Sequence, residues 1–194
     1  MKNTKVSIKK LVSFLYEVGT LRKIARSHRQ SLYTDDLSDN IASHSYRVTM
    51  IGILLSKLEG ADSNKVIRMC LLHDTDETRS NDQNWIHKKY VKVFEDEIQK
   101  DQFSFLGKNN EFNQIKDEYN DRKTLESRIA KDADMIDQCL LLREYEWAGN
   151  KEAARWLRGE SKHITTKSAL KIREEIKKQR PSVWWDNLWT SKRR

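Results

Sequence analysis

Proline and glycine are scarce in this chain, with one Pro and six Gly among 194 residues. Hairpins and β-sandwiches need these residues at their turns, so the scarcity argues against an all-β fold. Charged side chains make up 34% of the residues, which is typical of helices with solvated outer faces. A chain of this length also suits a single domain with a sizeable core. We therefore predict an all-α protein.

Cysteines are also few, and long apolar runs are missing. Cys70 and Cys139 both fall in apolar stretches, which favours reduced thiols in the core over a disulfide. No apolar stretch approaches the length of about 18 residues that a membrane-spanning helix needs, and no signal peptide opens the sequence. We expect a soluble, cytoplasmic protein that does not use a membrane.

The net charge of +8 is concentrated at the C-terminal end. Residues 151–194 contain 13 of the 37 basic side chains but only 5 of the 29 acidic ones, so residues 1–150 are neutral overall. A basic segment of this kind can meet nucleic acid or an acidic partner. A solvated helix face followed by a short basic tail is the simpler interpretation, so a nucleic-acid partner is not favoured.

One helical stretch ends in a pair of residues that is costly to bury. Residues 66–72 are largely apolar and lead directly into His73 and Asp74. Burying such a pair needs a compensating partner. A divalent cation would compensate both residues, because imidazole and carboxylate are good ligands for transition metals. The pair alone remains weak evidence, since capped or hydrogen-bonded residues give the same sequence.

Two distant stretches offer further ligands. His44 lies inside an apolar helical stripe, where a lone histidine is more often a satisfied core residue than a ligand. Residues 129–137 place Asp132, Asp134 and Asp137 on one largely apolar helix. Periodicity does not decide which of these carboxylates faces inward, since both Asp132 and Asp134 have apolar neighbours at helical spacing.

The order of these residues resembles a known family. His44, the His73–Asp74 pair and an Asp some sixty residues further on resemble the ligand pattern of the HD-domain metal-dependent phosphohydrolases. The resemblance covers most of residues 20–150 and is closer to the HD-domain 5′-deoxynucleotidases, which remove phosphate from deoxynucleoside monophosphates. It implies an all-α HD-domain bundle and a phosphomonoesterase of the 5′-nucleotidase type.

The resemblance also implies a complete site. Asp134 would be the fourth ligand, because the family's ligand is the second Asp of an Asp-x-Asp motif, and Asp132 and Asp137 would face outward or support the ligands. One divalent transition metal (Mn, Co, Fe, Zn or similar) would be bound by four residues: His44, His73, Asp74 and Asp134. The catalytic residues would be Glu77 and Asp82, and the substrate-binding residue would be Arg26.

These residues define an expected reaction, the removal of the 5′-phosphate from (deoxy)nucleoside monophosphates by a metal-bound water. Glu77, four residues after His73 and therefore on the same helical face, would orient or deprotonate that water. Arg26 would clamp the phosphate, and Asp82 would face the leaving-group oxygen or the sugar. Ser27 stands where the bacterial branch has an aromatic residue, which weakens any expectation of strict deoxyribose selectivity.

Two alternatives remain open at this point. An HD-type nucleoside triphosphate or phosphodiester hydrolase could use the same ligands, although the sequence lacks the second-metal histidine cluster of dinuclear HD phosphodiesterases. A non-catalytic nucleic-acid or protein-binding module could use the basic C-terminal segment. Intact ligand residues argue against the second alternative, because a binding module has no need of them.

The sequence predicts one domain, with a core over about 7–150 and a basic helical extension over 151–194. Turn formers and caps divide the chain into expected helices over 7–26, 41–59, the His-Asp stretch, 85–101, 110–120, 122–148, 151–159 and 166–180. Residues 29–40 should form a polar loop. The tryptophans at 184, 185 and 189 should dock on the core, with closure of a homodimer as the alternative.

Overall fold

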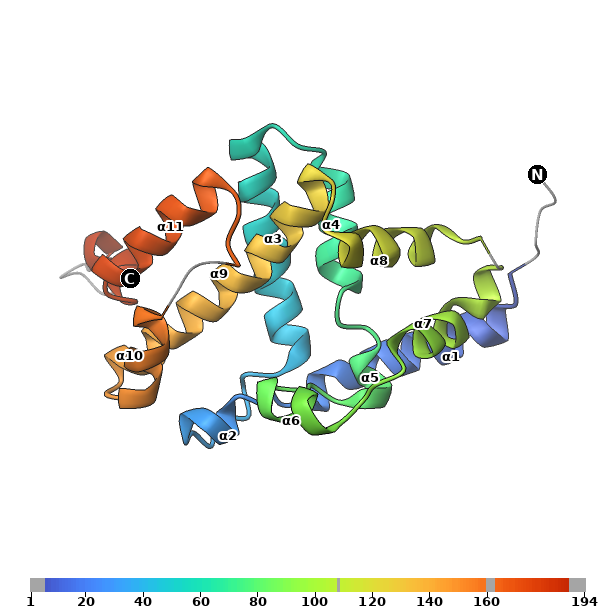
Figure 1. Ribbon diagram of the computed structural model, residues 1–194, viewed down its shortest axis with the longest axis horizontal. Helices are drawn as coiled ribbons and strands as arrows, with labels where there is room; N and C mark the ends of the chain where they lie inside the picture. Colours follow the sequence, from blue (N-terminus) through green and yellow to red (C-terminus); the bar gives the residue numbers. More distant parts are fainter. Residues whose placement is uncertain (1–5, 108, 160–162, 189–194) are drawn as a thin grey trace, which may run out of the picture.

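The computed structural model describes residues 6–107, 109–159 and 163–188, and these are helical (Figure 1). The one extended pairing within these ranges is an isolated antiparallel bridge between Ala25 and Asn40. No described helix is both long enough and apolar enough to cross a membrane. The prediction of an all-α protein is confirmed.

In chain order, the helices of the described residues are α1 (Ile8–Val18), η1 (Gly19–Lys23), α2 (Arg29–Leu32), α3 (Ile41–Glu59), α4 (Ser63–Leu72), α5 (Glu77–Ser80), α6 (Trp85–Tyr90), α7 (Glu95–Phe103), η2 (Ser104–Leu106), α8 (Glu111–Asp121), α9 (Leu125–Trp147), α10 (Lys151–Arg158), α11 (Lys167–Lys178) and η3 (Val183–Leu188).

The core forms where α3 and α9 cross near the centre of the molecule, with α4 packed against both (Figure 1). The inward stripe of α3 is buried as its spacing predicts, including Val48 and Leu55 at 0% exposure. Gly52 allows the close approach of α3 to α4, since a Cβ at this position would lie 2.8 Å from Cys70 Sγ. Cys70 and Cys139 are buried free thiols, as expected.

A second group of helices, α1, α5, α6 and α7, runs beneath this core in Figure 1. Phe14 of α1 packs edge-on against Phe103 of α7, with the ring centroids 5.6 Å apart. Glu17 accepts hydrogen bonds from Arg79 of α5 and from Gln102 of α7. Aromatic packing and one carboxylate therefore link α1 to α5 and α7.

The predicted first helix, 7–26, is too long. It changes to a 3-10 helix at Gly19 and becomes extended at Ile24, because the following residues pair with the segment before α3. Arg26 N donates to Asp39 O, and Ile41 N donates to Ile24 O. This tertiary pairing overrides helical propensity and places Arg26 in a loop.

Three further predictions need correction. The expected helix over 85–101 is two helices, α6 and α7, separated by extended backbone at Val91. The expected loop over 29–40 contains the short helix α2. Trp184 and Trp185 do not dock on the core, since they are 68% and 50% exposed and pack edge-on against each other. Trp189 lies outside the described residues.

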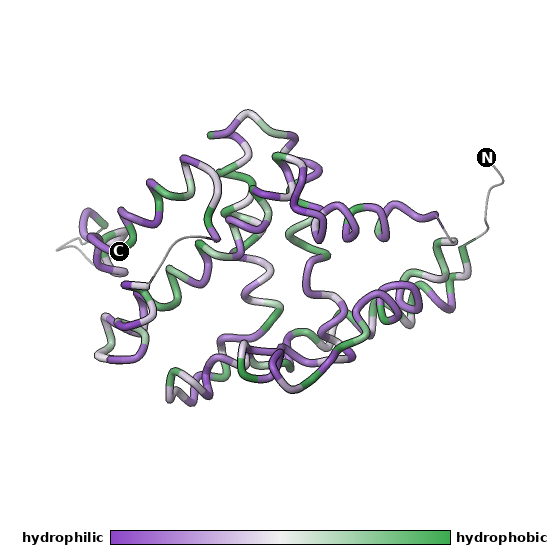
Figure 2. Tube along the Cα trace, in the orientation of Figure 1, coloured by the Kyte–Doolittle hydropathy of each residue, from purple (hydrophilic) through white to green (hydrophobic). Residues whose placement is uncertain are grey.

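The helices of the basic segment, α10 and α11, pack against α9. Figure 2 shows hydrophilic and hydrophobic residues interleaved along α9 and α11, as expected for helices with one buried face. Asp132 fixes the start of α11, because its buried carboxylate accepts hydrogen bonds from Thr165 N and Thr166 N. Asp132 was expected to face outward or to support the ligands, but it is buried and its carboxylate is bonded to the start of α11 instead, so this expectation is wrong.

Candidate metal centre

The His-Asp pair lies in a turn between two helices. α4 ends at Leu72, residues 73–76 form turns, and α5 begins at Glu77. The buried side chain of Lys116 stabilises this turn, because Lys116 Nζ donates to His73 O at 3.1 Å and pairs with Asp76. The prediction that His73 and Glu77 share the face of one continuous helix is therefore wrong.

Two imidazoles face each other in the core. His44 Nε2 and His73 Nε2 lie 3.3 Å apart, and both side chains are almost fully buried. The other nitrogen of each ring already has an acceptor: His44 Nδ1 lies 2.6 Å from Asp137 Oδ2, and His73 Nδ1 lies 2.8 Å from Cys70 O. If each Nδ1 donates, both Nε2 atoms present lone pairs to the same point, which is the arrangement that suits a shared cation.

Two carboxylates complete this cluster. Asp74 Oδ2 lies 3.0 Å from His73 Nε2, and Asp134 Oδ1 lies 3.4 Å from His44 Nε2. Ligand atoms of His44, His73 and Asp134 all lie within 4.8 Å of one another, close enough to hold one ion. His44, His73 and Asp134 thus fit a divalent transition metal, and the carboxylate of Asp74 lies beside them.

The charges of the cluster point the same way. Burial opposes ionisation of the two aspartates, yet His73 holds the pKa of Asp74 well below its usual range, and Lys131 lowers that of Asp134. Burial and Arg26 oppose a charge on His44, but the surrounding carboxylates, Asp137 first, raise its pKa to about 9. The protein atoms alone therefore leave negative charge in the cluster, and the positive charge of a divalent cation would neutralise it.

Asp137 supports the cluster from the far side of His44. Its two oxygens are divided between His44 Nδ1 and Arg47 Nε, and Arg47 also pairs with Glu144. The sequence allowed a supporting role for Asp137, and its contacts match that role. Lys116 and Arg47 are positioning residues that the sequence analysis did not identify. In the sequence, each is only a basic residue on a predicted helix near the acidic motifs.

Arg26 enters the site from the loop after η1. Its side chain is buried, with Nη2 donating to Gln138 Oε1 at 3.4 Å and Nε lying 3.7 Å from Asp82 Oδ2. Among the described residues, Arg26 Nε and Nη1 have no hydrogen-bond partner. Asp82 Oδ2 also accepts from Ser27 N at 2.6 Å and Ser27 Oγ at 3.0 Å, so Asp82 holds the loop that carries Arg26.

Glu77 lies at the start of α5 and lines the same cavity. Its Oε2 atom is buried and has no hydrogen-bond partner among the residues described. Burial, followed by Asp74 and Asp82, raises the pKa of Glu77 to about 10. A carboxyl group in this setting holds a proton until a cation enters beside it, and then releases the proton readily.

The cavity in front of the cluster has a volume of about 340 Å³ and a strongly polar lining. Arg26, His73, Asp74, Glu77, Asp82 and Asp134 all line it. His28 lines it too, and burial, followed by Arg26, lowers the pKa of His28 to about 4. His87 takes no part, because its Nδ1 accepts from Asn84 N in the capping box of α6.

Comparison with known proteins identifies the family. Residues 18–177 match the family model of the HD domain. The chain belongs to the HD-domain family. This membership confirms the resemblance read from the sequence. It assigns the protein to the superfamily of HD-domain metal-dependent phosphohydrolases.

The chain is also similar to individual proteins in sequence or in fold. The chain is 30% identical to 5′-deoxynucleotidase HDDC2 of Dictyostelium discoideum over 126 residues, which is 57% of this chain and 65% of the relative, just under two thirds of that protein. A conserved hypothetical protein from Pyrococcus furiosus is 25% identical, with a TM-score of 0.70 over 87% of this chain and 99% of its own. A predicted metal-dependent phosphohydrolase from Magnetospirillum magnetotacticum, at 20% identity and a TM-score of 0.62 over 90% of this chain and 97% of its own, shares the fold.

Proposed function

We propose that this protein removes the 5′-phosphate from (deoxy)nucleoside monophosphates. The observation that carries the proposal is the position of Arg26, which is buried beside the His-Asp cluster with two guanidinium nitrogens that have no hydrogen-bond partner among the described residues. A buried guanidinium with free donors suits the oxygens of a phosphate. The likeness to the Dictyostelium 5′-deoxynucleotidase supports the same substrate class.

The roles of the residues follow from their contacts. His44, His73, Asp74 and Asp134 would hold the metal, which when bound makes a water more acidic and neutralises charge on the phosphate. Arg26 would hold a phosphate oxygen, and Glu77 would accept the proton of the attacking water. The water oxygen forms the new bond to phosphorus while the bond to the 5′ oxygen breaks. The 5′ oxygen takes up a proton as it leaves, so inorganic phosphate and a nucleoside are released.

Asp82 is proposed to support the reaction by holding the loop that carries Arg26. It lines the cavity on the side of Arg26 and holds Ser27 through two hydrogen bonds. These contacts keep the arginine loop in place and engage the Ser27 hydroxyl, so Ser27 is not free to select the sugar by itself. We therefore expect deoxy substrates to be preferred only weakly over ribo substrates.

A substrate panel tests the proposal. The protein should be incubated with nucleoside 5′-monophosphates, nucleoside triphosphates and cyclic dinucleotides in the presence of Mn²⁺ or Co²⁺, and the nucleoside and nucleotide products should be identified by chromatography, because cleavage of a cyclic dinucleotide releases no inorganic phosphate. Monophosphates should be hydrolysed, whereas turnover of triphosphates or cyclic dinucleotides alone would assign the protein to a different HD activity. His73→Ala and Asp74→Ala should lose metal and activity but keep their helical circular dichroism, with the exposed residue changed in His163→Ala as the matched control.

A further inference from the structure

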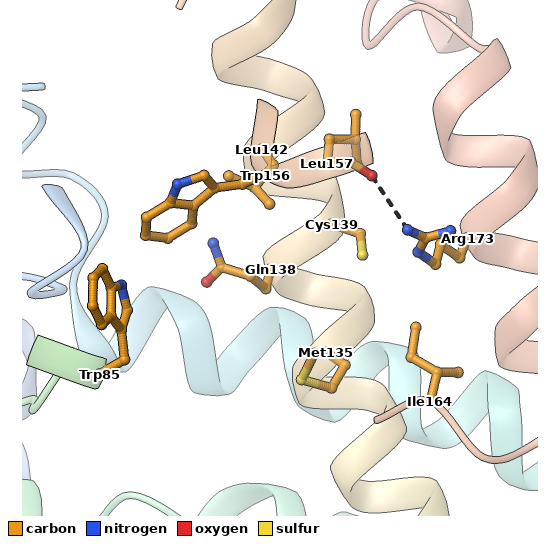
Figure 3. Close-up of a pocket in the computed structure, with 9 residues that line it drawn as sticks. All are labelled: Trp85, Met135, Gln138, Cys139, Leu142, Trp156, Leu157, Ile164 and Arg173. Atoms are coloured by element: carbon orange, nitrogen blue, oxygen red, sulfur yellow. Dashed lines mark hydrogen bonds between the residues drawn. The ribbon is translucent and has the colours of Figure 1, made fainter. Parts of the chain in front are cut away.

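A second cavity adjoins the metal cleft, which is the polar cavity lined by Arg26, His73, Asp74, Glu77, Asp82 and Asp134. It has a volume of about 300 Å³ and lies between the start of α6 and helices α9, α10 and α11 (Figure 3). Trp85, Met135 and Gln138 line both this cavity and the metal cleft. The second cavity continues with Trp156 and Ile164 and is mainly apolar. The two cavities therefore adjoin at these three side chains.

Gln138 connects the two cavities chemically. Its Oε1 accepts from Arg26 Nη2, which leaves its Nε2 facing away from the arginine. That Nε2 atom is buried and has no hydrogen-bond partner among the described residues. A buried amide donor without an acceptor is costly, so its presence points to a ligand that supplies one.

The walls beside Gln138 are aromatic. Figure 3 shows the indoles of Trp85 and Trp156 on the side of the cavity toward which the Gln138 amide extends. Trp85 lies at the mouth and is 67% exposed, so part of its indole is accessible to a ligand that enters from solvent. The other polar group of the cavity, Arg173, is already engaged with the carbonyl oxygen of Leu157 (Figure 3).

We propose that this cavity binds the base of the nucleotide substrate. The inference rests on the proposed nucleotidase function and adds the part of the site that recognises the leaving nucleoside. A nucleobase has flat apolar faces that stack on indole rings, and its edge carries acceptor atoms for Gln138 Nε2. The phosphate would lie at Arg26. The base would lie at Gln138, whose side chain is hydrogen-bonded to Arg26.

The test compares two substrates that differ only in the base. The kcat/KM for deoxyadenosine 5′-monophosphate is divided by the kcat/KM for 2-deoxyribose 5-phosphate. Loss of one stacking ring typically weakens base binding roughly 5- to 150-fold, so Trp85→Ala and Trp156→Ala should lower this ratio by a factor in that range. Gln138→Leu should lower it as well. Trp147→Ala, which changes a half-exposed tryptophan at the end of α9, should leave the ratio unchanged.

A binding measurement separates failure of this inference from failure of the proposed function. Deoxyadenosine 5′-monophosphate should quench the intrinsic tryptophan fluorescence of the wild-type protein, and Trp85→Phe combined with Trp156→Phe should remove most of that quenching while preserving the packing. If no monophosphate is hydrolysed, the proposed function fails, and quenching that depends on these two rings still supports the base site. A wild-type ratio near one, equal losses on both substrates, or no ring-dependent quenching would overturn the inference.

Discussion

His44 Nδ1 lies 2.6 Å from Asp137 Oδ2 in the interior of the protein. The contact fixes the orientation of the ring and directs Nε2 toward His73, Asp74 and Asp134. Arg47 holds the other oxygen of Asp137, so the carboxylate is kept ionised and cannot rotate freely. A carboxylate behind a metal-binding imidazole raises the basicity of the ligand and fixes its tautomer.

Replacing this carboxylate should weaken metal binding. Asp137→Asn keeps the size of the side chain but can turn an amide NH₂ toward His44 Nδ1, which favours the wrong tautomer. Loss of such a partner typically costs about 10- to 100-fold in metal affinity or activity. Titration of metal-free protein with Mn²⁺ measures the effect. Glu144→Gln, which changes the more exposed partner of Arg47, is the control and should bind metal nearly as wild type does.

Asp132 and Asp134 should separate stability from metal binding. Asp134 lies in the cluster, whereas Asp132 is fully buried and caps the start of α11 through Thr165 and Thr166. Asp134→Asn should therefore lose metal with little change in folding. Asp132→Asn should keep metal and unfold at a lower urea concentration. Loss of a buried acceptor for backbone donors should lower its free energy of unfolding by about 1–3 kcal/mol. The opposite pattern in metal analysis and urea titration would mean that the ligand assignment is wrong.

The residues that we propose as ligands stand out in the sequence because of their local context. His44 interrupts an apolar stripe, and His73–Asp74 follows two leucines, so burial of polar groups is evident from sequence alone. The choice of Asp134 came from the family pattern, because periodicity treats it and Asp132 alike. Only tertiary structure separates them, since the partners of Asp132 lie 33 and 34 residues further along the chain.

The surroundings of the ligands were not predictable in the same way. Lys116 reaches His73 O from α8, and Gln138 reaches Arg26 from α9, over 43 and 112 residues of sequence. A lysine or glutamine on a helix is ordinary in sequence and becomes significant only when the partner is known. The end of α1 was misjudged for a related reason, because pairing of Ala25 with Asn40 is a long-range contact that competes with local helical propensity.

Asp39 should make the metal-free protein sensitive to pH. Burial is the largest influence on its carboxyl group and raises its pKa from 3.8 to about 6, against the opposing effect of Arg26. The folded state therefore holds a proton that the unfolded chain has released between about pH 4 and 6. Stability contributed by this group is present at low pH and is lost as the pH rises through that window.

Asp39→Asn should remove this dependence, since an amide resembles the protonated carboxyl and does not ionise. Urea unfolding of metal-free protein at several pH values between 4 and 7 should show a flatter profile for the variant and greater stability than wild type at pH 7. Asp35→Asn, which changes an exposed neighbour, provides the control. An Asp39→Asn profile parallel to that of wild type would show that Asp39 ionises normally.

The last prediction is that Glu77 acts on the water and is not a metal ligand. It is the first residue of α5, directly after the His-Asp turn, and one of its oxygens is buried without a hydrogen-bond partner among the described residues. Loss of a general base typically lowers the rate about 10²–10⁴-fold. Glu77→Ala should therefore retain metal and bind a nucleoside monophosphate while kcat falls by roughly that factor. Glu97→Ala, on the exposed side of α7, should remain as active as wild type.

The raised pKa of Glu77, about 10 in the absence of a cation, adds a second measurement. A carboxyl that keeps its proton until a cation arrives must release that proton when metal binds. Metal titration of the wild-type protein at pH 8, followed with a pH indicator, should release about one proton more than the same titration of Glu77→Ala. Loss of metal in Glu77→Ala would make Glu77 a ligand and require another base. Full activity in that variant would mean that the metal alone activates the water.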